Sequence, residues 1–227
     1  EIAPSDWSSD VCSSDLNWNV LMEGTWFTVK LFLATIVLSL PLGFPIALGS
    51  NGKFWPLKIL CDFYVLIFRG TPLILQLFFF YFFLPLTFDI QLDIFKTSVL
   101  TFVLNYAAYF AEIYRGGINS IDTGQFEAAQ ALGLSKKQTM LDIILPQTMK
   151  SILPPVFNET IVLVKDTALA STIGMPDIMK VTTGIVSSTS NTAIFVGAAG
   201  IYLVLNLVLT LVQKAPKIGR ASCRERV

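Results

Sequence analysis

The sequence predicts an all-α membrane protein with about five transmembrane helices. Of its 227 residues, 53% are apolar and only 14% are charged, and the mean hydropathy is +0.64. A soluble domain carries about 25% charged residues, so this chain has too few groups to cover a surface that faces water. Its apolar residues gather in long stretches, and a helix needs about 20 of them to cross a bilayer core of about 30 Å.

Composition excludes several classes of function. The 16 basic and 16 acidic residues cancel, so the chain lacks the excess positive charge that binding to nucleic acid requires. It has no histidine, which excludes histidine metal sites and Ser-His or Cys-His relays. Its cysteines, Cys12, Cys61 and Cys223, are too scattered for a disulfide framework or a zinc site. We therefore expect no metal and no cofactor.

The two ends of the chain differ from the rest. Residues Asp6–Leu16 and Ile218–Val227 resemble translated sequencing adapters, and neither continues the apolar pattern beside it. We therefore expect residues 1–16 and 218–227 to be non-native and residues 17–217 to form one transmembrane domain.

The first predicted span covers Thr25–Leu48, and Pro41, Gly43 and Pro45 predict a kink in its second half. A turn follows at Ser50–Lys53. The segment Phe54–Phe68 carries Trp55, Lys58 and Asp62, and we expect it to be an interfacial helix or the lower end of the next span. The sequence Arg69–Pro72 interrupts that span, and Leu73–Leu86 continues it.

After a polar loop at Thr87–Lys96, a third span is predicted at Thr97–Ile113. The one extended hydrophilic segment runs from Tyr114 to Pro146. The fourth and fifth spans are predicted at Pro154–Met175 and Ala193–Val212, with a loop between them.

Lysines and arginines predict the orientation, because they collect in cytoplasmic loops. Nine lie on one side of the predicted spans and two, Lys96 and Lys180, on the other. The nine are Lys53, Lys58, Arg69, Arg115, Lys136, Lys137, Lys150, Lys214 and Lys217. The sequence therefore predicts an N-terminus outside the cell and a cytoplasmic C-terminus.

The hydrophilic segment predicts two short helices joined at a glycine. Gly124 precedes a run of helix formers that includes Ala128 and Ala129, and Glu127 is expected in the first turn, where a carboxylate favours the helix dipole. Gly133 is expected to end this helix. Ser135 is expected to cap a second helix, Lys136–Ile144, which Pro146 ends. A solvated connecting loop is the alternative interpretation.

This segment also carries a long motif. Glu127-Ala128-Ala129 is followed after three residues by Gly133 and after nine more by Ile143-Ile144-Leu145-Pro146. The spacing resembles the EAA loop of permease subunits of ATP-binding cassette (ABC) importers at every named position. In that family, the EAA loop is the coupling helix that docks on the ATPase. The resemblance therefore implies a coupling role for Gly124, Glu127, Ala128, Ala129, Gly133, Ile143, Leu145 and Pro146.

The flanking sequence resembles the polar amino acid uptake branch of that family, which includes histidine, glutamine and arginine permeases. The similarity spans about Val20–Val212 and includes Arg69-Gly70-Thr71-Pro72, Ala108–Ile118, Leu145-Pro146-Gln147 and Lys165-Asp166-Thr167. Ala168 departs from it, because many relatives have serine there.

The resemblance implies a type I ABC importer permease fold in a bacterial inner membrane. It also implies a cytoplasmic ABC ATPase, an extracytoplasmic solute-binding protein, and a second permease subunit in a homodimer or heterodimer. The expected substrate is an amino acid. The chain itself lacks a Gly-x4-Gly-Lys-Ser/Thr phosphate loop, because Gly52-Lys53 is followed by Phe54 and Ala47 stands where the first glycine belongs. We therefore expect a transport subunit and not an enzyme.

Polar residues within the predicted spans are the candidate solute pathway, because ionisable groups at that depth need a cavity or a partner. The fourth span places Asn158 and Lys165 on one stripe, and Glu159 and Asp166 on a second. The third span places Asn105 and Tyr109 on one face together with Glu112. These groups can either contact solute or bond between helices. Near the cytoplasmic end of the third span, Glu112 and Arg115 are expected to form interfacial pairs and not to contact solute.

Other functions remain open at this point. The EAA spacing alone also permits an importer of methionine, phosphonate or an osmolyte. A stand-alone secondary transporter or channel is a further alternative, although five spans and no inverted repeat do not favour it. A membrane-embedded enzyme is the least favoured, because the chain has no histidine and its carboxylates do not pair at a catalytic spacing on one face, except for Glu159 and Asp166, which are about two helical turns apart.

Overall fold

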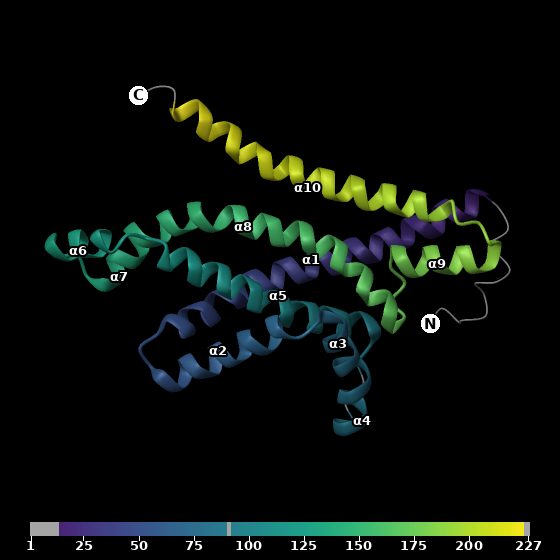
Figure 1. Ribbon diagram of the computed structural model, residues 1–227, viewed down its shortest axis with the longest axis horizontal. Coiled ribbons are helices and arrows are strands. Elements are labelled where there is room, and N and C mark those ends of the chain that lie inside the picture. The colour runs from purple at the N-terminus through teal and green to yellow at the C-terminus, as the bar shows by residue number, and fades with distance from the viewer. Residues whose placement is uncertain (1–13, 90–91, 225–227) are drawn as a thin grey trace. The chain divides into compact units, whose positions relative to one another are not determined.

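The computed structural model describes residues 14–89 and 92–224, and the side chains of residues 18–89 and 92–214. Every regular element in these ranges is helical (Figure 1). The α-helices are α1 (Ser14–Asn51), α2 (Trp55–Gly70), α3 (Leu73–Phe78), α4 (Leu84–Phe88), α5 (Ile94–Asn119), α6 (Thr123–Ala131), α7 (Lys136–Gln138), α8 (Leu145–Asp166), α9 (Ile178–Thr189) and α10 (Ile194–Arg224). Two π-helical segments, η1 (Phe79–Phe83) and η2 (Thr139–Ile144), and one 3₁₀ segment, η3 (Thr167–Ile173), complete them.

The prediction of non-native ends falls largely on residues that lie outside this description. Residues 1–13 and 225–227 are not described, and only the backbone of residues 14–17 and 215–224 is. That prediction stays a prediction.

Three described helices are long and apolar enough to cross a membrane. Their candidate spans are Trp18–Asn51, Ile94–Asn119 and Ile194–Lys214, and a fourth results if Trp55–Gly70 and Leu73–Phe88 form one broken span. Trp18–Asn51, Ile94–Asn119 and Ile194–Lys214 correspond to the first, third and fifth predicted spans, and the broken pair corresponds to the second. The first and third spans are longer than predicted. The chain remains helical through Pro41 and Pro45. The break in the second span lies at Thr71, so Arg69 and Gly70 still belong to α2.

The fourth predicted span is the exception to this agreement. In its place lie α8 and η3, and α8 starts at Leu145, well before the predicted Pro154. This helix contains Pro154, Pro155 and four ionisable residues, which lower its hydropathy. By length and composition, the described residues therefore hold three to four candidate spans, and these account for four of the five predicted ones.

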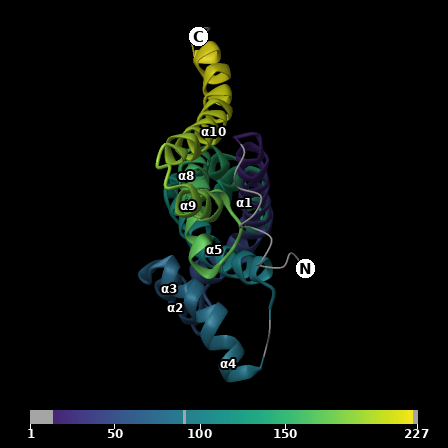
Figure 2. The same cartoon turned by 90° about the vertical axis from the view of Figure 1, so that its right-hand side faces the viewer.

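The chain divides into two compact units, the first of which contains Glu1–Thr35, Leu73–Thr101 and Thr160–Val227. In this unit α9 packs beside α10 (Figures 1 and 2). The buried side chains of Leu21, Val181 and Ile185 form a core between the start of α1 and α9.

Helix α9 lies where the sequence predicted a loop. Asp177 caps its first turn by accepting a hydrogen bond from the Lys180 backbone N–H at 2.9 Å. Asp177 lies outside the candidate spans, and burial of its carboxyl raises its pKa to about 6. The prediction failed because α9 has 12 residues, too few to cross a bilayer, and is rich in serine and threonine.

The second unit contains Ile36–Pro72 and Phe102–Glu159. Two tyrosines join its helices: the Tyr64 hydroxyl of α2 donates to the Leu104 carbonyl of α5 at 2.6 Å, and Tyr114 of α5 donates to the Leu40 carbonyl of α1 at 3.2 Å. Gly43 allows α1 to approach α5 closely, since a Cβ there would lie 3.0 Å from Phe110. This unit carries the hydrophilic segment.

Candidate functional site

The hydrophilic segment folds as a hairpin at the ends of α5 and α8 (Figure 1). We call α6, the turn at Leu132–Ser135 and α7 the EAA hairpin. Helix α6 starts at Thr123, and Asp122 caps it by accepting a hydrogen bond from the Gly124 backbone N–H at 2.7 Å. Asp122 therefore sets the helix start at Thr123, one residue before the predicted start signal, Gly124.

Glu127 lies in the second turn of α6, so its predicted position in the first turn is wrong. The reason is that the helix begins at Thr123 and gains one further residue before Glu127. Glu127 and Ala128 are exposed, whereas Ala129 is fully buried. The EAA motif thus places one residue against the protein and leaves two available to another molecule.

Gly133 ends α6, as predicted. Its φ is +73°, a left-handed conformation that glycine adopts at little cost. The Leu134 backbone N–H returns to the Ala129 carbonyl at 3.0 Å, and Gly133 donates to Gln130 at 3.0 Å. The backbone thereby turns sharply between the two helices.

Ser135 caps α7, which also confirms the prediction. Its hydroxyl accepts from the Gln138 backbone N–H, and the Gln138 side chain accepts from the Ser135 backbone N–H, a reciprocal capping box. The predicted stop at Pro146 is wrong, because α7 continues through η2 into α8 without a break. Pro146 lies in the first turn of α8, where the preceding π-helical segment takes up the irregularity.

Contacts on one side hold the EAA hairpin against α8. Gln147 donates to the Gln125 side chain at 3.3 Å, and Ile144 is fully buried. Ile143 and Leu145 are half-buried, and Pro146 is exposed. Ile143, Ile144 and Leu145 therefore pack against the rest of the protein and support the hairpin.

Helices α5 and α8 meet closely beside this hairpin. A Cβ on Gly117 would overlap the Ile152 side chain and lie 3.2 Å from Thr148. The absence of a side chain at Gly117 thus lets the two helices touch.

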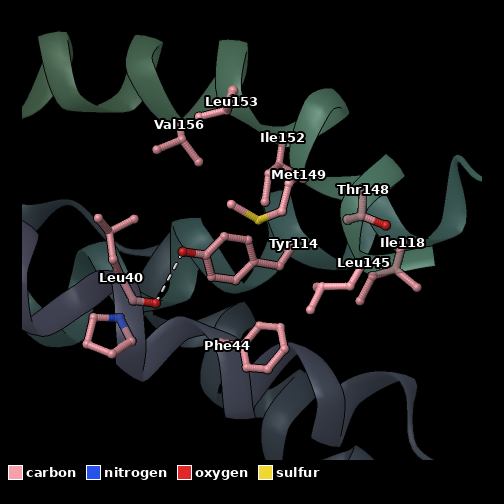
Figure 3. Close-up of a pocket in the computed structure, with 11 residues that line it drawn as sticks. Leu40, Phe44, Tyr114, Ile118, Leu145, Thr148, Met149, Ile152, Leu153 and Val156 are labelled. Atoms are coloured by element: carbon pink, nitrogen blue, oxygen red, sulfur yellow. Dashed lines mark hydrogen bonds between the residues drawn. The ribbon is translucent and has the colours of Figure 1, made fainter. Parts of the chain in front are cut away.

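An apolar cavity of about 390 Å³ lies between α1, α5 and α8 (Figure 3). It is lined by Leu40, Pro41, Phe44, Tyr114, Ile118, Leu145, Thr148, Met149, Ile152, Leu153 and Val156. Its polar side chains are Tyr114, which bonds to Leu40, and Thr148. Such a lining offers no charged group to either end of a zwitterion, so we do not place a polar solute in this cavity.

The candidate pathway residues lie in different surroundings. Asn105 is buried, and its amide donates to the Phe68 carbonyl at 2.9 Å, while Tyr109 is half-buried. On α8, Asn158 and Lys165 are exposed and Glu159 and Asp166 are half-buried. Asn105 therefore holds the end of α2 against α5, and on α8 the exposed Asn158 and Lys165 are accessible to other molecules.

Glu112 of α5 lies between two arginines. Arg115 donates to both of its carboxylate oxygens, at 3.0 and 2.5 Å, which confirms the pairing expected of these two residues. Arg69, at the end of α2, lies 3.7 Å from the same carboxylate and 5.3 Å from the centre of the Tyr109 ring. Sequence reasoning did not place Arg69 here, because the contact depends on how α2 packs against α5.

The family model described as "Binding-protein-dependent transport system inner membrane component" matches residues 39–215. The chain belongs to this family. The expectation of an ABC importer permease, drawn from the EAA motif, is thereby confirmed.

Curated relatives of the permease carry names of amino acid transporters. It is 42% identical over 196 residues to the arginine transport system permease protein ArtQ of Bacillus subtilis (strain 168), a match that covers 86% of this chain and 90% of the relative. It is 42% identical over 160 residues to the putative glutamine transport system permease protein GlnP of Rickettsia typhi, covering 70% and 73%.

Solved structures agree on the fold of the permease. An amino acid ABC transporter solved with histidines matches with a TM-score of 0.82 and 33% identity, over 87% of this chain and 92% of that one. The MetNI methionine transporter matches with a TM-score of 0.71 and 20% identity, over 92% and 98%. The permease therefore has the all-α type I importer fold.

Proposed function

We propose that this permease carries polar amino acids into the cytoplasm by alternating access, as a subunit of an ABC importer driven by a separate ATPase. The EAA hairpin is the observation that carries the proposal. One of its sides is held against α8, while Glu127 and Ala128 on α6 are exposed. A helix that packs against the protein on one side and is exposed on the other can bind a partner and transmit the movement of that partner to the protein.

In this proposal the ATPase binds the exposed face of α6. Small side chains such as Ala128 let the cleft of a partner approach the helix backbone, and Glu127 offers a charge. Movement of the ATPase displaces α6, and the contact of Gly117 with Ile152 passes that displacement to α5 and α8. The helices then rearrange around the solute.

The solute class follows from the relatives and from the exposed polar residues of α8. Relatives about 40% identical to this chain are named for arginine and glutamine, whereas the methionine transporter is related at 20% identity and supports the fold alone. Asn158, Glu159, Lys165 and Asp166, with Asn105 and Tyr109 of α5, supply the acceptors and donors that a zwitterion needs. We assign them to the solute pathway.

The proposal requires three partners and one orientation. A binding protein outside the cell delivers the amino acid, a second permease subunit completes the pathway, and the ATPase is cytoplasmic. The EAA hairpin must then face the cytoplasm. The distribution of lysine and arginine supports this orientation, since Lys136 and Lys137 lie in the hairpin itself.

Reconstitution of the complete complex in proteoliposomes tests the function. The permease, its ATPase and its binding protein are combined, and uptake of radiolabelled arginine, glutamine and methionine is measured with and without internal ATP. We expect ATP-dependent uptake of arginine or glutamine in excess of methionine. ATP-dependent uptake of methionine alone, or amino acid uptake that needs no ATPase, would contradict the proposal.

The same assay tests the coupling role of α6. We expect Glu127→Lys to abolish ATP-driven uptake, because it reverses the charge on the face that the ATPase binds, while the protein remains in the membrane. Asp142→Lys is the matched control, since Asp142 is also exposed but is not one of the matched positions of the EAA motif. Unchanged solute-stimulated ATP hydrolysis in the Glu127 variant would count against the coupling role.

A further inference from the structure

Arg69 has more hydrogen-bonding capacity than its neighbours use. It lies in the last turn of α2 with 40% of its side chain exposed. Its Nη1 atom is 3.7 Å from the Glu112 carboxylate, which is beyond hydrogen-bond distance. The guanidinium group has five N–H donors arranged as a planar fork.

Glu112 cannot serve both arginines equally. Arg115 already donates to both oxygens of this carboxylate, at 3.0 and 2.5 Å. The other acidic side chain near Arg115, Asp62, accepts a hydrogen bond from the Ser50 hydroxyl. Arg69 therefore interacts with the Glu112 carboxylate more weakly than Arg115 does.

The surroundings of Arg69 orient it. The guanidinium carbon lies 5.3 Å from the centre of the Tyr109 ring, a cation–π distance. The adjoining backbone is fixed as well, because Asn105 donates to the Phe68 carbonyl. A guanidinium group that is oriented by its neighbours and partly exposed can bind a further anion.

We propose that Arg69 is a solute-binding residue, whose guanidinium group binds the α-carboxylate of the transported amino acid. The planar fork matches a carboxylate through two parallel hydrogen bonds, which gives both strength and direction. Tyr109 is the residue that positions this fork. The assignment rests on the proposed function. It adds the residue that recognises the α-carboxylate, a group that all amino acids share.

The test measures binding to the permease–ATPase complex in nanodiscs, without the binding protein. The probes are L-arginine and L-glutamine, each compared with its α-carboxamide, which lacks the charged carboxylate. We expect the wild-type complex to prefer the free acid. Arg69→Gln should weaken binding of the free acid by roughly tenfold or more, the effect of losing a charge-assisted hydrogen bond, and should remove the preference over the amide.

Two further variants make the result specific. Arg69→Lys keeps the charge but not the fork, and should keep only part of the preference for the free acid. Lys58→Gln removes a charge from an exposed position of the same helix and should bind like the wild type. Assembly of each complex is checked by size-exclusion chromatography.

The outcomes separate the two proposals. If the wild-type complex binds arginine or glutamine and Arg69→Gln keeps the preference for the free acid, the assignment of Arg69 is overturned while the function stands. If Arg69→Gln and Arg69→Lys both fail to assemble, Arg69 is a structural residue and the assignment is also overturned. If the wild type binds neither amino acid, the proposed function fails and the assignment of Arg69 fails with it.

Discussion

Two adjacent glycines on α5 have different surroundings. A side chain at Gly117 would enter the contact with Ile152 and Thr148, whereas a Cβ at Gly116 would meet nothing within 4 Å. Both lie in the helix, where glycine is otherwise unfavourable by about 1 kcal/mol relative to alanine. The presence of glycine is therefore explained by packing at Gly117 only.

This difference predicts opposite effects of one substitution. Gly117→Ala should destabilise the protein by about 1–3 kcal/mol through overpacking against α8, and it should also reduce coupled transport. Gly116→Ala is the control and should leave stability unchanged or slightly raised. Thermal unfolding of the detergent-solubilised protein measures both effects.

A third variant identifies the contact that is responsible. Ile152→Ala removes the methyl group that a Cβ on Gly117 would meet. The double variant should therefore lose less stability than the sum of the two single variants. Equal melting temperatures for the alanine variants of Gly116 and Gly117 would disprove the close contact between α5 and α8.

At the scale of elements, the EAA hairpin is built from local signals. Asp122 caps α6, Gly133 ends it, and Ser135 with Gln138 caps α7. Each signal fixes the direction of the backbone over a few residues. The angle between α6 and α7, and so the position of Glu127, depends on the turn at Leu132–Ser135.

Gly133 offers a clean test of that dependence, because a Cβ there would meet nothing and only the backbone would be strained. Gly133→Ala should cost about 1 kcal/mol at φ +73° and reduce ATP-driven uptake. Gly133→Asn should be tolerated better, since asparagine adopts the left-handed conformation more readily. Uptake in proteoliposomes measures the difference. Alanine and asparagine variants of equal activity would show that the turn does not set the position of α6.

At the scale of the whole molecule, orientation in the membrane is the property on which the transport mechanism depends. We predict that a single cysteine at Lys137, in the EAA hairpin, reacts with a membrane-impermeant maleimide only from the cytoplasmic side. A single cysteine at Asn191, between α9 and α10, should react only from outside. Both positions are exposed.

Right-side-out and inside-out vesicles provide the measurement, in a background where Cys12, Cys61 and Cys223 are replaced. The Asn191 variant serves as the opposite-side control for the Lys137 variant. If Lys137 is labelled from outside the cell, the ATPase has no access to the hairpin, and the proposed coupling is excluded.

Features encoded by neighbouring residues were predictable from the sequence. The apolar stretches predicted α1, α5 and α10, Gly133 predicted the left-handed end of α6, and Ser135 predicted the cap of α7. The failures have a common cause. Pro146 was expected to end a helix and α9 was expected to be a loop, because local rules take no account of a π-helical segment or of packing against α10.

The sequence by itself determined that the chain is a helical membrane protein with an EAA motif, since hydropathy and motif spacing are properties of contiguous residues. Only the tertiary structure decided which residue of that motif is buried, that Gly117 contacts Ile152, and that Arg69 meets Tyr109 and Glu112. These contacts join residues more than 30 positions apart in the chain. Their geometry is fixed by how whole helices pack, and no local pattern records it.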